Sequence, residues 1–185
     1  MTVKFTDAGL NRLAIGAVMT SVPPQNCRGE DMSSELDETD LQLLALLQKD
    51  GLQSMADLSK AIGVAPSTLN DRVKRLGRMG AISGTRAHVD PTALGLNLLA
   101  FVFVGWSEAA VESDFLKRVA AAEQVLECHH VTGAWNYLLK VRVRDTKALE
   151  QFLGSVLKQV KGLQRTETLI VLSSPKETTV LSTAG

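Results

Sequence analysis

Apolar residues between positions 36 and 90 recur every three or four residues in three short blocks, which is the spacing of amphipathic helices. Asp37 precedes the first block and is a good N-cap residue, because its carboxylate can accept hydrogen bonds from exposed backbone N–H groups. Ser54 precedes the second block in the same way, and Pro66 suits the first turn of the third. Gly63 permits a sharp turn between the last two blocks. Two short helices joined by such a turn predict a helix-turn-helix.

The third block, residues 66–78, carries a net charge of +3 beside its apolar stripe, although the chain as a whole is neutral. Hydroxyl and amide side chains lie near its start, where a recognition helix meets the edges of bases. Cations lie further along, where phosphates and guanines are the expected targets. A solvated helix face is the alternative, which the three-helix spacing disfavours. The residues of this block that are expected to contact DNA are Ser67, Thr68, Asn70, Arg72, Lys74, Arg75 and Arg78.

The segment after the third block, residues 81–89, predicts a short two-stranded wing that bends at Gly84. Arg86 in this wing is expected to touch the DNA backbone beside the recognition helix. An Asp-Pro dipeptide then marks a boundary, because proline restricts the conformation of the residue before it. We therefore expect a winged helix-turn-helix domain over residues 36–90 and a linker over residues 91–97.

From residue 98 onward the pattern changes to alternating strands and helices. A dense apolar run over residues 98–106 predicts a strand that is buried on much of both faces. Further strands are expected over residues 125–131, 137–143 and 166–172, and helices over residues 108–122 and 146–160. This βαββαβ order predicts a ferredoxin-like domain over residues 98–185, which makes the whole chain an α+β protein. The helices cover one face of the sheet, so we expect dimerisation through the other face or through the edges.

The first 35 residues lack sustained periodicity and are expected to form a flexible N-terminal extension. Alternatively, translation begins at Met32, because a Gly-Glu pair just upstream matches an in-frame ribosome-binding sequence. No apolar run reaches the ~18 residues that a membrane span needs, and the apolar stretch 13–18 is short for a signal-peptide core. The only two cysteines, Cys27 and Cys128, lie far apart. These features favour a reducing, cytoplasmic location without membrane contact.

The run Cys128-His129-His130 contains metal-ligating side chains, but on a strand the two histidines point to opposite faces. Joint chelation is therefore not expected, and we predict neither a metal site nor a cofactor. A structural cysteine beside one exposed histidine is the better interpretation.

The sequence resembles the Lrp/AsnC, or feast/famine, family of transcriptional regulators over residues 36–175. The segments that carry this resemblance are LDETDLQLLALLQKDG, LSKAIGVAPSTLNDRVKRLGRMGAI, VDPTALG, VLECHHVTGAWNYLLKV and TETLIVL. Together they are far more specific than a single motif. The resemblance implies a sequence-specific regulator that binds double-stranded DNA and is not an enzyme. It also implies homodimers that assemble into octamers or other multimers of dimers.

The resemblance further implies an effector, an amino acid or related metabolite, that is bound where dimers meet. In the family the pocket draws on the loop after the second strand and on the start of the last strand. The effector-binding residues expected here are Gly133, Ala134, Trp135, Asn136, Gln164, Thr166 and Thr168.

Two positions in that loop depart from the family pattern. Many relatives carry acids where this chain has Ala134 and Asn136. An aspartate can pair with the ammonium group of a ligand, whereas asparagine offers only a hydrogen bond. Asn136 therefore contacts the effector or merely caps the turn, and Trp135 lines the pocket or lies buried at an interface. The effector is expected to differ from those of the acid-bearing members, or to be absent.

Two other functions are left open by the sequence. The first is an architectural DNA-binding protein without an effector. The second is a haem-pathway decarboxylase, because some enzymes of that pathway share this architecture. The histidines that would serve a porphyrin site are His88, His129 and His130.

Overall fold

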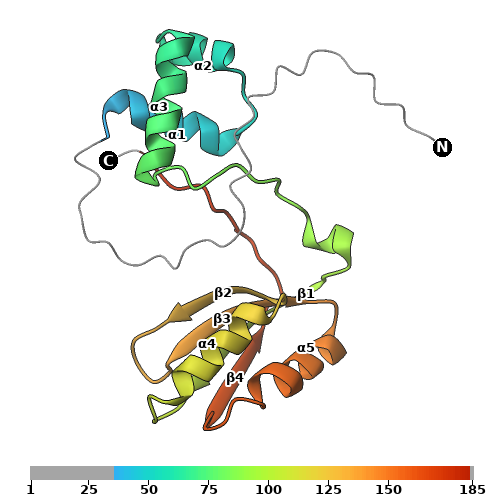
Figure 1. The fold of residues 1–185 in the computed structure, drawn as a ribbon. Helices are drawn as coiled ribbons and strands as arrows, with labels where there is room; N and C mark the ends of the chain where they lie inside the picture. Colours follow the sequence, from blue (N-terminus) through green and yellow to red (C-terminus); the bar gives the residue numbers. More distant parts are fainter. Residues whose placement is uncertain (1–35, 184–185) are drawn as a thin grey trace, which may run out of the picture.

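The computed structural model describes residues 36–183, which form a helical domain and a sheet-containing domain joined by a linker (Figure 1). The expected extension over residues 1–35, with its alternative start at Met32, lies outside the described residues. Within the described part of the chain, no helix is long and apolar enough to cross a membrane.

Three helices form the first domain: α1 (Glu38–Lys49), α2 (Met55–Ile62) and α3 (Pro66–Met79). α1 begins with a capping box, in which the Asp37 carboxylate accepts from the backbone N–H of Asp40 at 2.8 Å and the Asp40 carboxylate accepts from that of Asp37 at 3.2 Å. Ser54 caps α2 and Pro66 opens α3, as the sequence predicts. Gly63 ends α2 with φ 78°, a left-handed conformation that glycine adopts without strain. The predicted helix-turn-helix is therefore confirmed.

Four leucines without exposed surface form the core of this domain, namely Leu43, Leu58, Leu69 and Leu76. All three helices contribute to this core, so it holds α3 against both α1 and α2. Burial of each leucine contributes about 1.5–3 kcal/mol. The apolar spacing of α1 favours Leu41, Leu44 and Leu47 as core residues, but these three are only half-buried. Leu43, which this spacing does not single out, is the fully buried leucine of α1.

Residues 81–90 leave α3 as an irregular segment that pairs with no strand among the described residues. The two-stranded hairpin expected over residues 81–89 is therefore wrong in this detail. Residues 83–90 are all exposed, so no buried apolar face holds a second strand in place. Gly84 still marks a bend, because its φ of 145° is one that other residues rarely adopt.

The second domain begins with a short 3-10 turn at Pro91–Leu94 and then follows the predicted βαββαβ order. Its elements are β1 (Leu98–Gly105), α4 (Val111–Ala121), β2 (Val125–His130), β3 (Tyr137–Val143), α5 (Thr146–Phe152) with a π-helical turn at Leu153–Leu157, and β4 (Arg165–Ile170). The strands form one antiparallel sheet in the order β2-β3-β1-β4. At its centre Val102 of β1 lies opposite Leu139 of β3 and Thr168 of β4.

α4 and α5 lie on one face of this sheet (Figure 1). Side chains alternate between the faces along each strand, so every second residue of β3 points into the core beneath the helices and is buried. Phe115 of α4 and Phe152 of α5 pack into the same core. Among residues 36–183, no helix covers the outer face of the sheet. The two cores share no residue, so each domain is held by its own apolar cluster.

Candidate functional site

α3 exposes most of the residues that the sequence predicts to contact DNA. Ser67, Thr68, Lys74 and Arg78 are exposed, and Asn70 is half-buried. Lys74 approaches Asp71 at 4.0 Å, which is a loose surface ion pair of small energetic value. Arg86 is exposed on the segment that follows α3. These side chains are available to a partner without rearrangement of the core.

Arg72 and Arg75 differ from the other cations of α3, because both reach a buried acid on α1. Asp40 has no exposed surface. Its Oδ1 accepts a hydrogen bond from Nη1 of Arg72 at 2.9 Å, and its Oδ2 accepts one from Nη2 of Arg75. Nη1 of Arg72 also donates to Oδ2 of Asp37 at 2.6 Å. These charge-assisted hydrogen bonds join α3 to the first turn of α1.

The pKa of Asp40 reflects two opposed influences. Burial alone would raise this pKa, because a charged carboxylate loses its hydration. Hydrogen bonds from Arg75, Arg72 and the backbone N–H of Asp37 outweigh burial, so the pKa lies below its ordinary value. Hydrogen bonding to Asp37 and Asp40 in turn raises the pKa of Arg72. Asp40 and Arg72 are therefore both charged at neutral pH.

Sequence reasoning explains Asp40 only as a first-turn acid that complements the dipole of α1. The position of Asp40 along α1 is a stronger indication that its side chain is buried and paired. Asp40 lies three residues before Leu43 and seven before Leu47, on the helix stripe that faces the core. An acid on such a stripe requires a cation from another element, because buried carboxylates are almost always paired.

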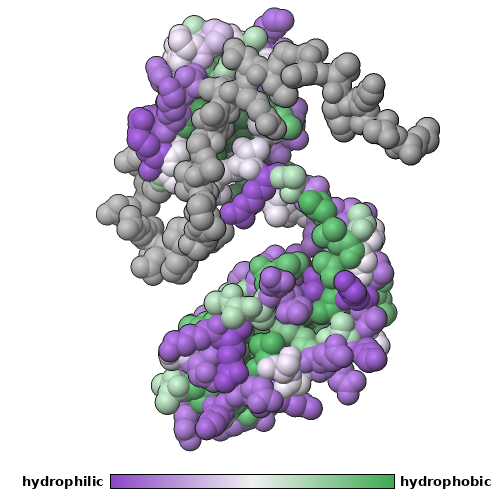
Figure 2. Space-filling model, turned by 45° about the vertical axis from the view of Figure 1, so that its right-hand side comes forward, coloured by the Kyte–Doolittle hydropathy of each residue, from purple (hydrophilic) through white to green (hydrophobic). Residues whose placement is uncertain are grey.

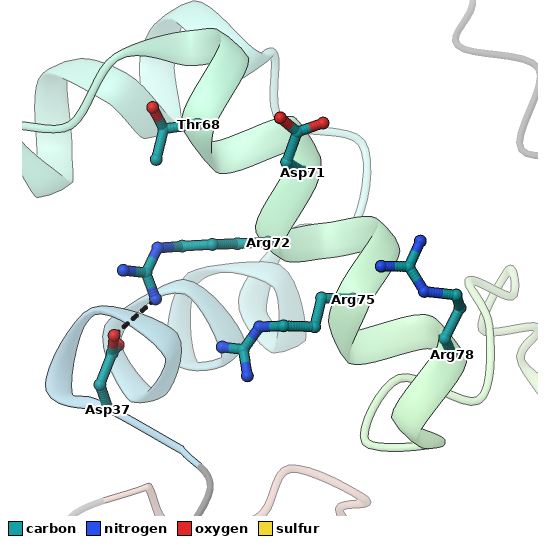
Figure 3. Close-up of a pocket in the computed structure, with 6 residues that line it drawn as sticks. All are labelled: Asp37, Thr68, Asp71, Arg72, Arg75 and Arg78. Atoms are coloured by element: carbon teal, nitrogen blue, oxygen red, sulfur yellow. Dashed lines mark hydrogen bonds and ion pairs between the residues drawn. The ribbon is translucent and has the colours of Figure 1, made fainter.

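An open hollow of about 550 Å³ lies beside α3, and the residues that line it are Asp37, Thr68, Asp71, Arg72, Arg75 and Arg78. Figure 3 shows Arg72 and Arg75 extending from α3 toward α1, whereas Arg78 points away from α1. Three guanidinium groups thus surround the hollow with only two carboxylates. Asp40 pairs with Arg72 and Arg75, so with this buried acid the carboxylates balance the three guanidinium groups. The exposed Arg78 and the wide opening suit a phosphate group on a large partner rather than an enclosed small molecule.

In the second domain, the loop between β2 and β3 meets the end of β1. Oδ1 of Asn136 accepts a hydrogen bond from the backbone N–H of Trp106 at 2.8 Å. Gln164, which lies just before β4, reaches the same strand end, where its Oε1 accepts from Oγ of Ser107 at 3.0 Å. The structure therefore brings together two of the predicted effector-binding residues. The Asn136 oxygen holds the strand end, which is the structural role that the sequence left open.

Arg165 is a residue of this region that sequence reasoning missed. Its guanidinium carbon lies 4.5 Å from the centre of the Trp135 ring, a cation–π contact. Trp135 in turn packs against Phe103, with ring centres 5.8 Å apart. Gly105 makes room for the arginine, because a Cβ at this position would lie 2.7 Å from Nε of Arg165. No local motif marks Arg165; only its alternation with the neighbouring residues of β4 places it on the face of Trp135.

Thr166 and Thr168 lie on the other face of β4. They pair with Val104 and Val102 of β1, whose side chains point into the core beneath the helices. The sheet therefore separates these two threonines from the outer face, where Arg165 lies. The structure brings the loop and Gln164 together but does not add the threonines to that group.

Gly133 and Ala134 complete the predicted effector-binding set. Both are exposed in the loop after β2, and Gly133 has φ 107°, which favours glycine. Neither side chain is polar, so these two residues offer only backbone groups for polar contacts.

The potential metal ligands of β2 have other contacts. Nε2 of His129 lies 3.1 Å from Oε2 of Glu127, whereas the ring of His130 stacks on that of Tyr137 with centres 4.8 Å apart. The two histidines thus face opposite sides of the sheet, as predicted. Burial raises the pKa of the Cys128 thiol to about 11, which makes it a poor nucleophile at neutral pH. Among residues 36–183, no three side chains of the metal-ligating types converge.

Two family models match the chain. The winged helix-turn-helix DNA-binding model matches residues 36–83, and the Lrp/AsnC ligand binding domain matches residues 99–181. The leucine-responsive regulatory protein of Escherichia coli K12 is 39% identical over 145 residues, which cover 77% of this chain and 88% of that protein. The HTH-type transcriptional regulator FL11 of Pyrococcus abyssi is 35% identical over 150 residues, which cover 81% of this chain and 98% of that protein.

Solved structures of transcriptional regulators also resemble this chain. A transcriptional regulator of Neisseria meningitidis, crystallised as a complex with L-Met, matches with a TM-score of 0.76 at 32% identity and covers 79% of this chain and 96% of its own. Escherichia coli AsnC matches with a TM-score of 0.74 at 30% identity and covers 78% of this chain and 97% of its own.

Proposed function

This chain belongs to the Lrp/AsnC family of DNA-binding transcriptional regulators, and from that premise we propose that α3 reads the major groove of double-stranded DNA. The observation that carries this proposal is the open hollow beside α3, which three arginines and Thr68 line. Arg72 and Arg75 also line this hollow while their guanidinium groups hold Asp40. The residues assigned to DNA contact are Ser67, Thr68 and Asn70 toward base edges, Arg72, Lys74, Arg75 and Arg78 toward phosphates or guanines, and Arg86 toward the adjacent DNA backbone.

The test is Arg78→Ala, because Arg78 is exposed and points away from α1. This variant is expected to bind DNA more weakly, with the slope of log affinity against log salt reduced by about 0.9 for one lost phosphate contact. A mobility-shift titration at several salt concentrations measures both quantities. Lys117→Ala is the matched control, since it removes one exposed positive charge from α4 of the other domain. Unchanged affinity and slope in Arg78→Ala would refute the contact.

We propose that the effector of the second domain is an amino acid or a related metabolite. In support, this domain matches a ligand binding domain, and the similar Neisseria regulator was crystallised with L-Met. The proposed site centres on the end of β1, where Asn136 and Gln164 each form a hydrogen bond. Arg165 suits the carboxylate of such a ligand. The set proposed to bind the effector is Gly133, Ala134, Trp135, Asn136 and Gln164. Thr166 and Thr168, which the sequence also assigns to the effector, lie on the opposite face of β4 and are left out of this site.

A thermal-shift screen of the twenty amino acids tests this proposal. A ligand at ~100 times its dissociation constant adds ~2.7 kcal/mol of stability, which is readily detected. Gln164→Ala is expected to abolish the shift, because it removes the polar group that Ser107 positions. A screen in which no amino acid raises the melting temperature would instead favour an architectural DNA-binding protein without an effector.

We propose that the chain forms homodimers through the outer face of the sheet, and multimers such as octamers from these dimers. Phe103 and Leu169 contribute apolar surface to that face, and Leu169 is 49% exposed. Figure 2 shows hydrophobic patches among hydrophilic ones on the surface of this domain. Leu169→Lys should shift sedimentation toward monomers, whereas Leu116→Lys, at a 40% exposed position of α4, should not. Equal sedimentation of Leu169→Lys and the wild type would contradict the interface.

We also propose a division into a DNA-binding domain at residues 36–90, a linker at 91–97 and an effector domain at 98–185. The relatives named above are transcriptional regulators, which supports a cytoplasmic protein that catalyses no reaction. Purified protein that turned over a porphyrin substrate would overturn the last point.

A further inference from the structure

The chain does not end at the sheet. After β4, the segment of residues 171–183 leaves the second domain and runs back to the helical domain (Figure 1). We propose that this segment is a strap that holds the DNA-binding domain at a fixed place relative to the sheet, with Gln48 of α1 as its anchor. The proposal concerns the coupling of the two domains and goes beyond the binding of DNA or effector.

At the sheet, the strap is held by a backbone hydrogen bond and by charge. The backbone N–H of Val171 donates to the carbonyl of Leu99 at 2.9 Å. Further along, Oε1 of Glu177 accepts from Nζ of Lys140 at 2.6 Å, and Oε2 lies 3.8 Å from Nη2 of Arg142. Both cations lie on the outer face of β3, where their side chains are only 16% exposed. Partial burial strengthens such pairs, because water screens them less.

At the helical domain, one side chain holds the strap by two hydrogen bonds. Nε2 of Gln48 donates to the carbonyl of Leu181 at 3.1 Å, and Oε1 of Gln48 accepts from the N–H of Leu181 at 2.7 Å. The glutamine amide thus pairs with both polar groups of one backbone residue, as a neighbouring strand would. Because α1 also carries Asp40, which holds Arg72 and Arg75 of α3, the anchor lies on the helix that supports the recognition helix.

The number of residues between the two contacts determines how far the domains can separate. The contact at Leu181 lies only four positions after the contact at Glu177, and four extended residues span at most about 14 Å. The covalent connection between α3 and β1, which comprises residues 80–97 and includes the linker, could by itself span about 60 Å if extended. While both contacts hold, the strap is therefore the shorter tether and limits the separation of the domains.

The strap is held by polar contacts rather than by burial. Leu172, Val180 and Leu181 are already 97%, 51% and 75% exposed. Detachment of the segment therefore exposes little additional apolar surface to water. A tether of this kind opens without disturbing either core. β4 connects Gln164 to the strap, so a movement of β4 would be transmitted to α1. Only this coupling of effector binding to α1 rests on the proposed effector site.

The first test is amide hydrogen exchange of residues 176–183 in the full-length protein, without DNA or any ligand. Gln48→Ala is expected to raise the exchange rate of this segment by about two- to tenfold, the effect of losing a net hydrogen bond. Gln42→Ala is the matched control, because Gln42 is an exposed glutamine of the same helix whose Nε2 donates to Glu38 at 3.4 Å. Equal exchange in wild type and Gln48→Ala overturns the anchor.

The second test is small-angle X-ray scattering of Leu181→Pro, which removes the N–H that Gln48 accepts from while the exposed side chain carries no packing. A broader distribution of interatomic distances than in wild type and Gln42→Ala is the expected result. An identical distribution overturns the tether. Protection of residues 176–183 that disappears on dilution would place the contact between two copies and overturn a strap within one chain. Because neither measurement uses a ligand, failure of the amino-acid screen leaves both results unaffected.

Discussion

Asp40 and Arg72 lie 32 residues apart in the sequence, yet Oδ1 of the acid accepts a hydrogen bond from Nη1 of the arginine at 2.9 Å. The acid has no exposed surface and also accepts from Arg75. Two of the arginines that make α3 look like a DNA-binding helix therefore also hold it against α1. The side chains that we propose to contact DNA therefore also stabilise the helical domain.

Asp40→Asn is expected to lower the free energy of unfolding of the helical domain by about 3 kcal/mol, because it removes the buried negative charge that pairs with both Arg72 and Arg75. Urea denaturation followed by circular dichroism measures this. Asp71→Asn, at a 79% exposed position of α3, should change stability by less than about 0.5 kcal/mol. Similar midpoints for the two variants would mean that the buried acid contributes little.

The pH dependence of stability follows from the lowered pKa of Asp40. The folded state favours the charged carboxylate, so its contribution is fully present above the ordinary value of 3.8. As the pH falls, the unfolded chain takes up the proton first, and stability is lost down to the lower pKa of the folded state. Urea titrations across this range should give wild-type and Asp40→Asn stabilities that converge as the pH falls. A constant difference between them would contradict this account.

The role of Asn136 can be tested by two substitutions, one that removes its side-chain oxygen and one that keeps an oxygen but adds a negative charge. Asn136→Ala removes the acceptor of the Trp106 N–H and should cost about 1 kcal/mol of stability. Asn136→Asp keeps an oxygen in the same place and should retain nearly all of that stability. The aspartate should also tighten the binding of ligands with an ammonium group, which calorimetric titration with an amino acid found in the screen would measure. Equal destabilisation by both variants would show that the hydrogen bond is unimportant.

Gly105→Ala is expected to push Arg165 off the ring of Trp135, because the new Cβ would lie 2.7 Å from its Nε and 3.1 Å from its Cγ. The change in tryptophan fluorescence should match that of Arg165→Ala, since each variant removes the same cation–π contact. Gly154→Ala, where the new Cβ meets nothing within 4 Å, serves as the control and should leave the fluorescence unchanged. Wild-type emission from Gly105→Ala would indicate that the arginine keeps its place.

Most of the fold could be predicted from the sequence because its signals are local. Asp37, Ser54 and Pro66 cap or open their helices through groups within three residues, and the strands follow from runs of apolar side chains. The wing could not be predicted in this way, since no local rule says whether its exposed residues find a partner strand.

The candidate site was harder to predict, because its decisive contacts join distant parts of the chain. Asp40 is recognisable as buried only once α3 is packed on α1, and Arg165 meets Trp135 only across the sheet. The pairing of Gln48 with Leu181 spans 133 residues, and a lone glutamine on an amphipathic helix gives no sign of it. Composition and periodicity contain no information about such pairs.

The separation of the two apolar cores also bears on how a protein of this kind changes over generations. No residue belongs to both clusters, so substitutions in one core should add to those in the other without coupling. The half that meets a metabolite can therefore drift toward a new chemical signal while the half that meets DNA keeps its operator. Recombination at the linker would exchange these halves as intact units, and a lineage could acquire a new regulatory circuit without rebuilding either fold.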